Sequence, residues 1–330
     1  MLELYIYIIK KNYMKILVTG SAGFIGYHLV EKLTNNKKNA VLGIDSINNY
    51  YSTKIKKLRI KILKKKKNFF FKKINLQNKK KTEVIIKKFQ PDTVFHIAGQ
   101  PGVLYSFKNP LSYKKNNTMA TKNLILVCKK YKIKKFIFAS SSSVYGDQKK
   151  FPIKENFKKN PKNYYAKTKL KCEQIVKKIF NKSDTEYMIY RFFTVYGPLG
   201  RPDMFIHKFL NSIKKNKKIL LHNNGMNFRD FTYVDDLIRI LILTIKKIPT
   251  NKVLNICRSK PIKTTYLVNL INKIYGNNIN KIVNTGFVKG EMLKTHGSNN
   301  MLKKNFKNLK FTNLQLGLKK TILSYKKFSY

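Results

Sequence analysis

The run ILVTGSAGFIG at 16–26 constrains the fold more than any other part of the chain. Its β-branched residues predict a buried strand, and its three glycines predict a tight turn that opens into a helix from about Phe24 to Leu33. Glycine allows the chain to reverse, lets a pyrophosphate approach the main chain and lets the new helix pack on the strand. This order is typical of a dinucleotide-binding site, although a glycine-rich turn in another α/β protein has the same pattern.

A second predicted strand, VLGID at 41–45, ends in a carboxylate. Asp45 follows Gly26 at about the spacing, roughly 20 residues, at which an acidic side chain meets the adenosine ribose in such sites. A carboxylate there repels a 2′-phosphate, so the sequence favours NAD over NADP. Ala98 and Gly99 end a later strand with small side chains, which would let the cofactor lie close.

Predicted strands and helices alternate through the first half of the chain. A strand at 69–74, a helix at 80–89, a long helix at 109–130 and a buried strand at KKFIFAS follow one another. This alternation predicts right-handed βαβ units and a doubly wound, Rossmann-type parallel sheet, the α/β class. We expect an N-terminal extension at 1–13, an NAD-binding domain at 14–190 and a smaller C-terminal α/β substrate-binding domain at 191–330. Some strands and helices of the last part should return to the NAD-binding domain.

Polar side chains end the KKFIFAS strand and occupy the helix after it, at the edge of the sheet where ligands bind. Serines fill positions 140–143, and Tyr165 and Lys169 lie four residues apart, hence on one helical face. A phenol is a poor base at neutral pH, but a neighbouring ammonium and a nicotinamide cation both favour the phenolate. We predict that Tyr165 takes the proton of a sugar hydroxyl as hydride leaves for the nicotinamide, with Ser141 hydrogen-bonding that hydroxyl and Lys169 holding the nicotinamide ribose. The alternatives are a chance Tyr–Lys spacing and an ordinary polar strand end.

The net charge of +55 would ordinarily indicate a polyanionic partner. The excess is nearly all lysine, spread from end to end beside abundant Asn and Ile, and all three have A/T-rich codons. A biased genome explains this composition, so we expect no specific nucleic-acid partner. The three cysteines have no metal-ligand spacing and no apolar run reaches membrane length, which predicts a cytoplasmic protein without metal or membrane anchor.

Taken together, the motifs resemble the extended short-chain dehydrogenase/reductase family, specifically its NAD-dependent sugar epimerases and dehydratases. The matching pieces, in the family's order, are TGSAGFIG at 19–26, Asp45, HIAGQPGV at 96–103, SSSSVYG at 140–146, YAKTK at 165–169 and RDFTYVDD at 229–236. The resemblance implies Ser141, Tyr165 and Lys169 as catalytic triad and Arg229 at the phosphates of a UDP-sugar. It also implies Asn75 near the adenine, where the family has aspartate, and a homodimer through the helices near 110–130 and 165–180.

Within that family, RFFTVYGPLGRPDM at 191–204 is most similar to the UDP-glucuronate 4-epimerases. In those enzymes the matching threonine and arginine are associated with the sugar carboxylate, which implies this role for Thr194 and Arg201. A guanidinium fork and a hydroxyl suit a carboxylate, although an arginine that only caps a loop before a proline would look the same. Family dehydratases carry an Asp-Glu pair after the catalytic hydroxyl residue, and decarboxylases carry a glutamate in that strip. Here Ser142 and Ser143 stand there, and the resemblance places them at the substrate.

The resulting hypothesis is an isomerase that converts UDP-glucuronate to UDP-galacturonate through a 4-keto intermediate. The alternatives are a 4-epimerase for UDP-glucose or UDP-N-acetylglucosamine, a UDP-glucuronate decarboxylase and a non-catalytic relative that binds polyanions. The predicted cofactor-binding set is Gly20, Gly23, Phe24, Ile25, Gly26, Asp45, Asn75, Ala98, Gly99, Tyr165 and Lys169.

Overall fold

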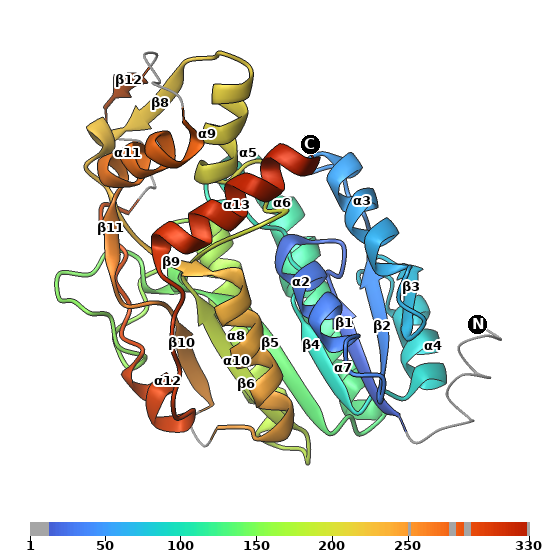
Figure 1. The fold of residues 1–330 in the computed structure, drawn as a ribbon. Helices are drawn as coiled ribbons and strands as arrows, with labels where there is room; N and C mark the ends of the chain where they lie inside the picture. Colours follow the sequence, from blue (N-terminus) through green and yellow to red (C-terminus); the bar gives the residue numbers. More distant parts are fainter. Residues whose placement is uncertain (1–12, 250–251, 277–281, 287–291, 329–330) are drawn as a thin grey trace.

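The structure is a computed structural model, and it describes residues 13–249, 252–276, 282–286 and 292–328. Figure 1 shows a large sheet with helices on both sides and a smaller group of elements over one end of it. Nearly all of the N-terminal extension predicted at 1–13 lies outside the described residues. No helix among the described residues is long and apolar enough to cross a membrane.

The large sheet has seven strands in the order β10-β6-β5-β4-β1-β2-β3, and every neighbouring pair is parallel. Its strands are β1 (Met14–Thr19), β2 (Asn39–Asp45), β3 (Phe69–Lys73), β4 (Thr93–His96), β5 (Lys135–Ser141), β6 (Glu186–Phe192) and β10 (Val253–Ile256). The strand order reverses between β1 and β4, which is where ligands of such sheets bind. The predicted Rossmann-type fold is confirmed, and β10 returns to this sheet from the C-terminal part of the chain.

Helices cover both faces of the large sheet. One face carries α4 (Lys79–Phe89), α7 (Ala120–Lys130) and α8 (Tyr164–Phe180), and the other carries α2 (Phe24–Leu33), α3 (Thr53–Leu63) and α10 (Val234–Lys246). The bounds of α2 are those predicted from the sequence. The long helix predicted at 109–130 is divided into α6 (Pro110–Tyr113), the π-helix η1 (Lys114–Met119) and α7, after the short α5 (Tyr105–Lys108).

The smaller part of the molecule consists of two small sheets and the remaining helices. One sheet joins β7 (Thr194–Tyr196), β9 (Phe228–Tyr233) and β11 (Pro261–Lys263), and the other joins β8 (Ile219–His222) and β12 (Ile282–Thr285). The helices are α9 (Phe205–Lys214), α11 (Thr264–Tyr275) and α13 (Leu314–Phe328), while α12 (Asn300–Asn305) contacts β10 of the large sheet. The domain boundary at 190/191 stays a prediction.

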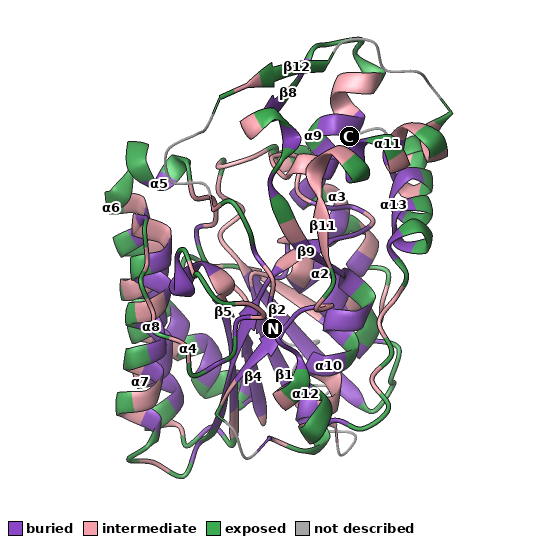
Figure 2. Cartoon of the chain, turned by 90° about the vertical axis from the view of Figure 1, so that its left-hand side faces the viewer, coloured by how far each residue is buried: buried purple, intermediate pink, exposed green. Residues whose placement is uncertain are grey.

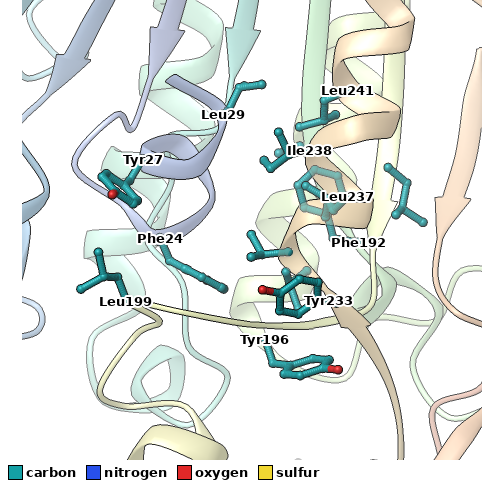
Figure 3. Packing of buried hydrophobic residues seen from close by; sticks show 14 of the residues in the cluster. Phe24, Tyr27, Leu29, Phe192, Tyr196, Leu199, Tyr233, Leu237, Ile238 and Leu241 are labelled. Atoms are coloured by element: carbon teal, nitrogen blue, oxygen red, sulfur yellow. The ribbon is translucent and has the colours of Figure 1, made fainter. Parts of the chain in front are cut away.

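One hydrophobic core joins the glycine turn to the segment that follows β6. Figure 2 shows buried residues concentrated in the strands of the large sheet and on the inner sides of its helices. In Figure 3, side chains of α2 face those of α10 and of the 192–199 segment. The labelled residues are Phe24, Tyr27, Leu29, Phe192, Tyr196, Leu199, Tyr233, Leu237, Ile238 and Leu241. The first helix after the turn is therefore packed directly against the chain that leads into the substrate part.

Candidate active site

A single cavity of about 1080 Å³ lies over the carboxyl ends of β1, β2, β4 and β5. Every site residue predicted from the sequence lines it. These residues are Gly20, Gly23, Phe24, Ile25, Gly26, Asp45, Asn75, Ala98, Gly99, Ser141, Ser142, Ser143, Tyr165, Lys169, Thr194, Arg201 and Arg229. Within the described part of the chain, no group of three or more metal-ligating side chains comes together.

The glycine turn is shaped by contacts between main chains. Gly20 has φ +74°, and a Cβ placed there would lie 2.8 Å from the main chain of Ala98. A Cβ on Gly26 would lie 2.1 Å from the Gly20 carbonyl oxygen. The turns after β1 and β4 thus abut where the strand order reverses, and α2 begins against them with its first amides directed at the cavity side. A turn of this kind fits a dinucleotide pyrophosphate.

Asp45 ends β2 on the wall of the same cavity. Its carboxylate accepts hydrogen bonds from the main-chain amides of Ala22, at 3.1 Å, and Ile47, at 2.7 Å. Burial raises the pKa of Asp45 above its ordinary value, although these bonds and the charge of Lys56 oppose the rise. The carboxylate therefore holds the turn in place and still faces the cavity, which suits a ribose hydroxyl.

Lys56 of α3 is a cavity residue that sequence reasoning missed. Its amine donates to the carbonyl oxygen of Asn48, at 2.6 Å, and to that residue's Oδ1, at 2.7 Å. Burial lowers the pKa of Lys56 to about 8. This stretch is rich in lysine, so composition alone does not separate Lys56 from its neighbours. Positions 56, 59, 60 and 63 share one helical face, and this spacing is the signal that could have found Lys56 and Arg59.

Tyr165 stands near the start of α8, where Asn163 caps the helix through a 2.9 Å bond to the amide of Ala166. The Tyr165 ring packs edge-on against Tyr113, with ring centroids 6.2 Å apart. Its hydroxyl makes no hydrogen bond to any of the described residues, so it is available to a ligand in the cavity.

Lys169 and Ser141 are both held by the end of β5. The buried Lys169 amine donates to the Ala139 carbonyl at 2.8 Å. Ser141 Oγ accepts hydrogen bonds from the amide of Ser143, at 3.2 Å, and from its hydroxyl, at 3.0 Å. The predicted triad residues therefore come together along one wall, with the lysine fixed and the tyrosine hydroxyl open to the cavity.

The turn after β4 is tied to α8 by Asn117, a second residue that sequence reasoning missed. Asn117 Oδ1 accepts from the Gln100 amide at 2.6 Å, and its Nδ2 donates to Thr168 Oγ1 at 3.0 Å. A Cβ on Gly99 would lie 3.1 Å from Asn117 Oδ1 and 3.2 Å from the Lys169 amine. Asn117 lies in the π-helix η1, which no sequence period predicts.

A buried ion pair lies directly behind the triad. Arg191 Nη2 is 2.7 Å from Glu173 Oε2, and Ser140 Oγ donates to Glu173 Oε1 at 2.5 Å. Arg191 Nη1 also donates to the Tyr145 hydroxyl at 2.9 Å. Because these bonds join β5, β6 and α8, they fix the elements that carry the triad relative to one another.

Arg201, which also lines the cavity, is paired with an acidic side chain. Arg201 Nε and Nη2 donate to the two oxygens of Asp203, at 3.0 and 2.5 Å, and the Tyr50 hydroxyl donates to Asp203 at 3.2 Å. Against burial, which would raise it, the Arg201 guanidinium holds the pKa of Asp203 below its ordinary value. Thr194 begins β7 and also lines the cavity. The sequence predicted Arg201 as a site residue, but it did not predict the pairing with Asp203 or the bond from Tyr50 to Asp203.

Basic side chains line the part of the cavity walled by β8 and β9. They are Lys218, His222 and Arg229. Arg229 Nη1 donates to the carbonyls of Phe228, at 2.9 Å, and Leu293, at 3.3 Å, which keeps the guanidinium at the cavity rim. This wall suits the phosphates of a nucleotide ligand.

The sequence profile of the NAD-dependent epimerase/dehydratase family matches residues 16–257. The chain belongs to that family. The membership confirms the resemblance drawn from the motifs, and it confirms NAD as the predicted cofactor. A relative in this epimerase/dehydratase family, the UDP-glucuronate 4-epimerase of Thermodesulfobacterium geofontis, is 36% identical over 262 residues, which are 79% of this chain and 80% of that one.

Solved structures of epimerases in the family share the fold over nearly the whole length. The UDP-glucuronic acid 4-epimerase from Bacillus cereus, in complex with UDP-glucuronic acid and NAD, has a TM-score of 0.90 and 31% identity, covering 95% of this chain and 99% of that one. The UDP-glucose 4-epimerase from Thermotoga maritima, with UDP-glucose, has a TM-score of 0.88 and 27% identity, covering 96% of this chain and 100% of that one.

Proposed function

We propose that this protein is an NAD-dependent isomerase that interconverts UDP-glucuronate and UDP-galacturonate by epimerisation at C4. The observation that carries the proposal is the shared cavity, which is lined by the glycine turn, by Ser141, Tyr165 and Lys169, and by Thr194 and Arg201. The named relative and the Bacillus cereus structure, both UDP-glucuronate 4-epimerases, support this choice of substrate.

Bound NAD supplies a hydride acceptor that becomes the hydride donor within the same turnover. Tyr165 takes the proton of the 4-hydroxyl as C4 becomes a ketone, and it returns that proton to the oxygen when hydride comes back to the other face of the sugar. Lys169 would hold the nicotinamide ribose, and Ser141 would hydrogen-bond the reacting oxygen. Because the hydride and the proton are both returned, no net oxidation accompanies the reaction.

The cofactor would be held by the main chain of the two abutting turns and by Asp45 at the ribose. The full set is Gly20, Gly23, Phe24, Ile25, Gly26, Asp45, Asn75, Ala98, Gly99, Tyr165 and Lys169. Ser142 and Ser143 would contact the sugar, and Arg229 would meet the phosphates.

Thr194 and Arg201 would hold the sugar carboxylate. The oxidised sugar is a β-keto acid, which loses CO₂ readily when the C–C bond to the carboxylate lines up with the ketone π system. Fixing the carboxylate on a hydroxyl and a guanidinium would keep that bond out of line. Ser142 and Ser143 stand where dehydratases and decarboxylases of the family carry acidic residues, and this agrees with the proposed epimerase activity.

A neutral UDP-hexose is the second candidate substrate, and the Arg201–Asp203 pair favours it. One edge of the guanidinium is occupied by Asp203, and this partner already balances its charge. In that case Arg201 would be structural.

The deciding experiment supplies purified protein with UDP-glucuronate and, separately, with UDP-glucose. We expect UDP-galacturonate from the first and little product from the second. UDP-xylose would overturn the proposal in favour of decarboxylation, and accumulating NADH would overturn catalytic use of the cofactor. Arg201→Ala should lower kcat/KM on UDP-glucuronate by about 10-fold or more, since a charge-assisted hydrogen bond is lost. Unchanged kinetics would remove the carboxylate role.

We also propose a cytoplasmic homodimer without a specific nucleic-acid partner. The three cysteines are free thiols, which suits a reducing compartment. The dimer would use the α6–η1–α7 segment and α8, and Leu111 and Met119 expose 55% and 45% of their surface there. A monomeric mass in solution would contradict the dimer. Tight, steeply salt-dependent RNA binding would contradict the absence of a specific nucleic-acid partner.

A further inference from the structure

The loop between β7 and α9 is held by side chains that bind its carbonyl groups one after another. The carbonyl of Gly197 accepts from His207 Nε2 at 3.1 Å, and that of Pro198 accepts from His28 Nε2 at 2.8 Å. The carbonyl of Leu199 accepts from Arg59 Nε and Nη2 at 3.2 and 2.7 Å. The next carbonyl, of residue 200, accepts from Arg59 Nη2 at 3.1 Å. We call Arg59, His28 and His207 the carbonyl clamp.

Arg59 uses all of its N–H groups in this arrangement. A guanidinium has five N–H donors. Nε and Nη2 supply three bonds to the loop, while Nη1 donates to the Ala22 carbonyl of the glycine turn at 2.8 Å and to the Tyr51 hydroxyl at 2.9 Å. One side chain therefore joins the turn that faces the cofactor to the loop at the substrate end.

The clamp is buried, and Arg59 forms no direct ion pair with a described carboxylate. Arg59 is 0% exposed, and none of the described carboxylates lies within ion-pair distance of it. Carbonyl oxygens stabilise this cation instead. Burial lowers the pKa of His28 and that of His207 to about 4, so both rings are neutral near pH 7. Because a carbonyl oxygen only accepts, each ring carries its proton on Nε2.

The loop needs this support because its backbone is unusual. Leu199 has φ +46°, in the left-handed region that residues with a Cβ rarely adopt. A Cβ on Gly200 would lie 2.2 Å from His207 Nε2, so the loop also fits closely against the clamp. Strained backbone of this kind persists where its surroundings hold it, and it is concentrated at functional sites.

The next residue after the clamped carbonyls is Arg201, which lines the cavity. Its side chain is 18% exposed and its pairing with Asp203 lies within the same short loop. The direction in which Arg201 leaves the main chain is thus set by the loop that the clamp holds.

We propose that the carbonyl clamp positions Arg201 for the carboxylate of an acidic nucleotide-sugar, and that Arg59 is its central positioning residue. The inference rests on the proposed function, because it assumes that Arg201 meets the sugar acid. It adds that recognition of the acid depends on a side chain in the NAD-binding part of the chain, one that never touches the sugar.

The test compares two ligands on NAD-loaded protein by calorimetry: UDP-glucuronate, which carries the acid, and UDP, which does not. Arg59→Lys keeps the charge but offers three donors in place of a planar fork of five. We expect the Kd of UDP-glucuronate to rise about 10-fold, as for loss of a charge-assisted hydrogen bond, and the Kd of UDP to change by less than about 2-fold. Arg239→Lys on α10, whose guanidinium is paired with Asp236, is the matched control and should leave both values unchanged.

A double variant separates positioning from a general structural effect. In an Arg201→Ala background, Arg59→Lys should add less than about 2-fold to the loss, because the two residues act through one contact. Equal losses for both ligands, or fully additive losses, would overturn the inference. If the wild type itself binds UDP-glucuronate no more tightly than UDP, the proposed substrate fails and the inference with it.

If Arg59→Lys does not fold, the histidine of the clamp on α2 serves instead. His28→Met removes the donor to Pro198, and His28→Gln keeps an N–H at a similar reach. His28→Met should weaken UDP-glucuronate selectively and His28→Gln should restore it. A His28→Met protein with wild-type values for both ligands would contradict the clamp.

Discussion

The two ends of the cavity are built in different ways. At the cofactor end, main chain meets main chain: Gly20 lies against Ala98, and Gly26 lies against the Gly20 carbonyl. At the substrate end, side chains from α2, α3 and α9 hold a loop by its carbonyls, and the charge of Arg201 is met by Asp203. The first end is shaped by the absence of side chains, and the second by the presence of a few particular ones.

This difference predicts how each end responds to change. A close main-chain contact leaves no room to adjust, so one added methyl at the cofactor end should disturb both the fold and the site. A contact made by side chains can be weakened in steps, so changes at the substrate end should alter selectivity while the fold persists. Variants of both ends, and of the catalytic tyrosine that they share, distinguish these two responses.

Tyr165→Phe should cause the largest loss. The hydroxyl has no partner among the described residues, so its removal leaves no unpaired group in the protein and takes away only the proton acceptor. We expect kcat on UDP-glucuronate to fall about 10²- to 10⁴-fold, the usual contribution of a general base. The Tm should stay as in the wild type, which separates a loss of chemistry from a loss of fold.

Tyr164→Phe is the matched control for this prediction, since the neighbouring tyrosine does not line the cavity. It should retain kcat within about 2-fold. Equal losses in the two variants would mean that the helix start, rather than the Tyr165 hydroxyl, carries the effect.

Gly26→Ala should break the cofactor end. The new Cβ would lie 2.1 Å from the Gly20 carbonyl oxygen, so the turn has to move. We expect the free energy of unfolding to fall by about 1–3 kcal/mol, as for an overpacked core, and the Kd of NAD to rise about 10-fold or more because the pyrophosphate turn is displaced. Denaturant titration and calorimetry measure the two quantities.

Gly286→Ala provides the comparison, because a Cβ there meets no atom of the described residues within 4 Å. Its stability and its NAD affinity should equal those of the wild type. A Gly26→Ala protein that binds NAD normally would show that the cofactor end tolerates movement, against the contrast drawn above.

The cofactor end was predictable from the sequence for the same physical reason. Glycine is required wherever a Cβ cannot fit, so the positions of the glycines at 16–26 predict the geometry of the turn. Tyr165 and Lys169 were found in the same way, since a four-residue spacing fixes a shared helical face. Alternating strands and helices then gave the parallel sheet, including α2 with its observed bounds.

The substrate end was only partly predictable. Thr194 and Arg201 were placed by resemblance, but the Arg201–Asp203 pair, with Tyr50 beside it, depends on loops that meet only in the folded chain. Arg59 was hidden among lysines, and the four groups that accept its hydrogen bonds lie in three separate segments. The π-helix η1 was missed, and the partners of Asn117, the Gln100 amide and Thr168 Oγ1, lie outside that helix.

The smallest expected effect concerns the Lys56 amine, which we expect to donate a hydrogen bond to the ribose of NAD. Lys56→Met should raise the Kd of NAD about 3- to 10-fold, as for loss of one hydrogen bond near the ribose. Lys57→Met removes the same charge from the exposed neighbour on α3 and should leave the Kd unchanged. Equal Kd values for these two variants would assign Lys56 to the fold alone.

The pH dependence gives this last prediction a distinct signature. Burial lowers the pKa of Lys56 to about 8, so the amine loses its proton at lower pH in the folded protein than in the unfolded chain, where the pKa is 10.5. The unfolded chain therefore binds more protons between pH 8 and 10.5, and this group makes the free energy of unfolding rise with pH in that window. NAD affinity should move in the opposite direction, falling as the pH passes 8, because the neutral amine is a weaker donor to the ribose. Both trends should be absent in Lys56→Met. If the NAD affinity of the wild type does not change from pH 7 to 9.5, the Lys56 amine does not bind the ribose.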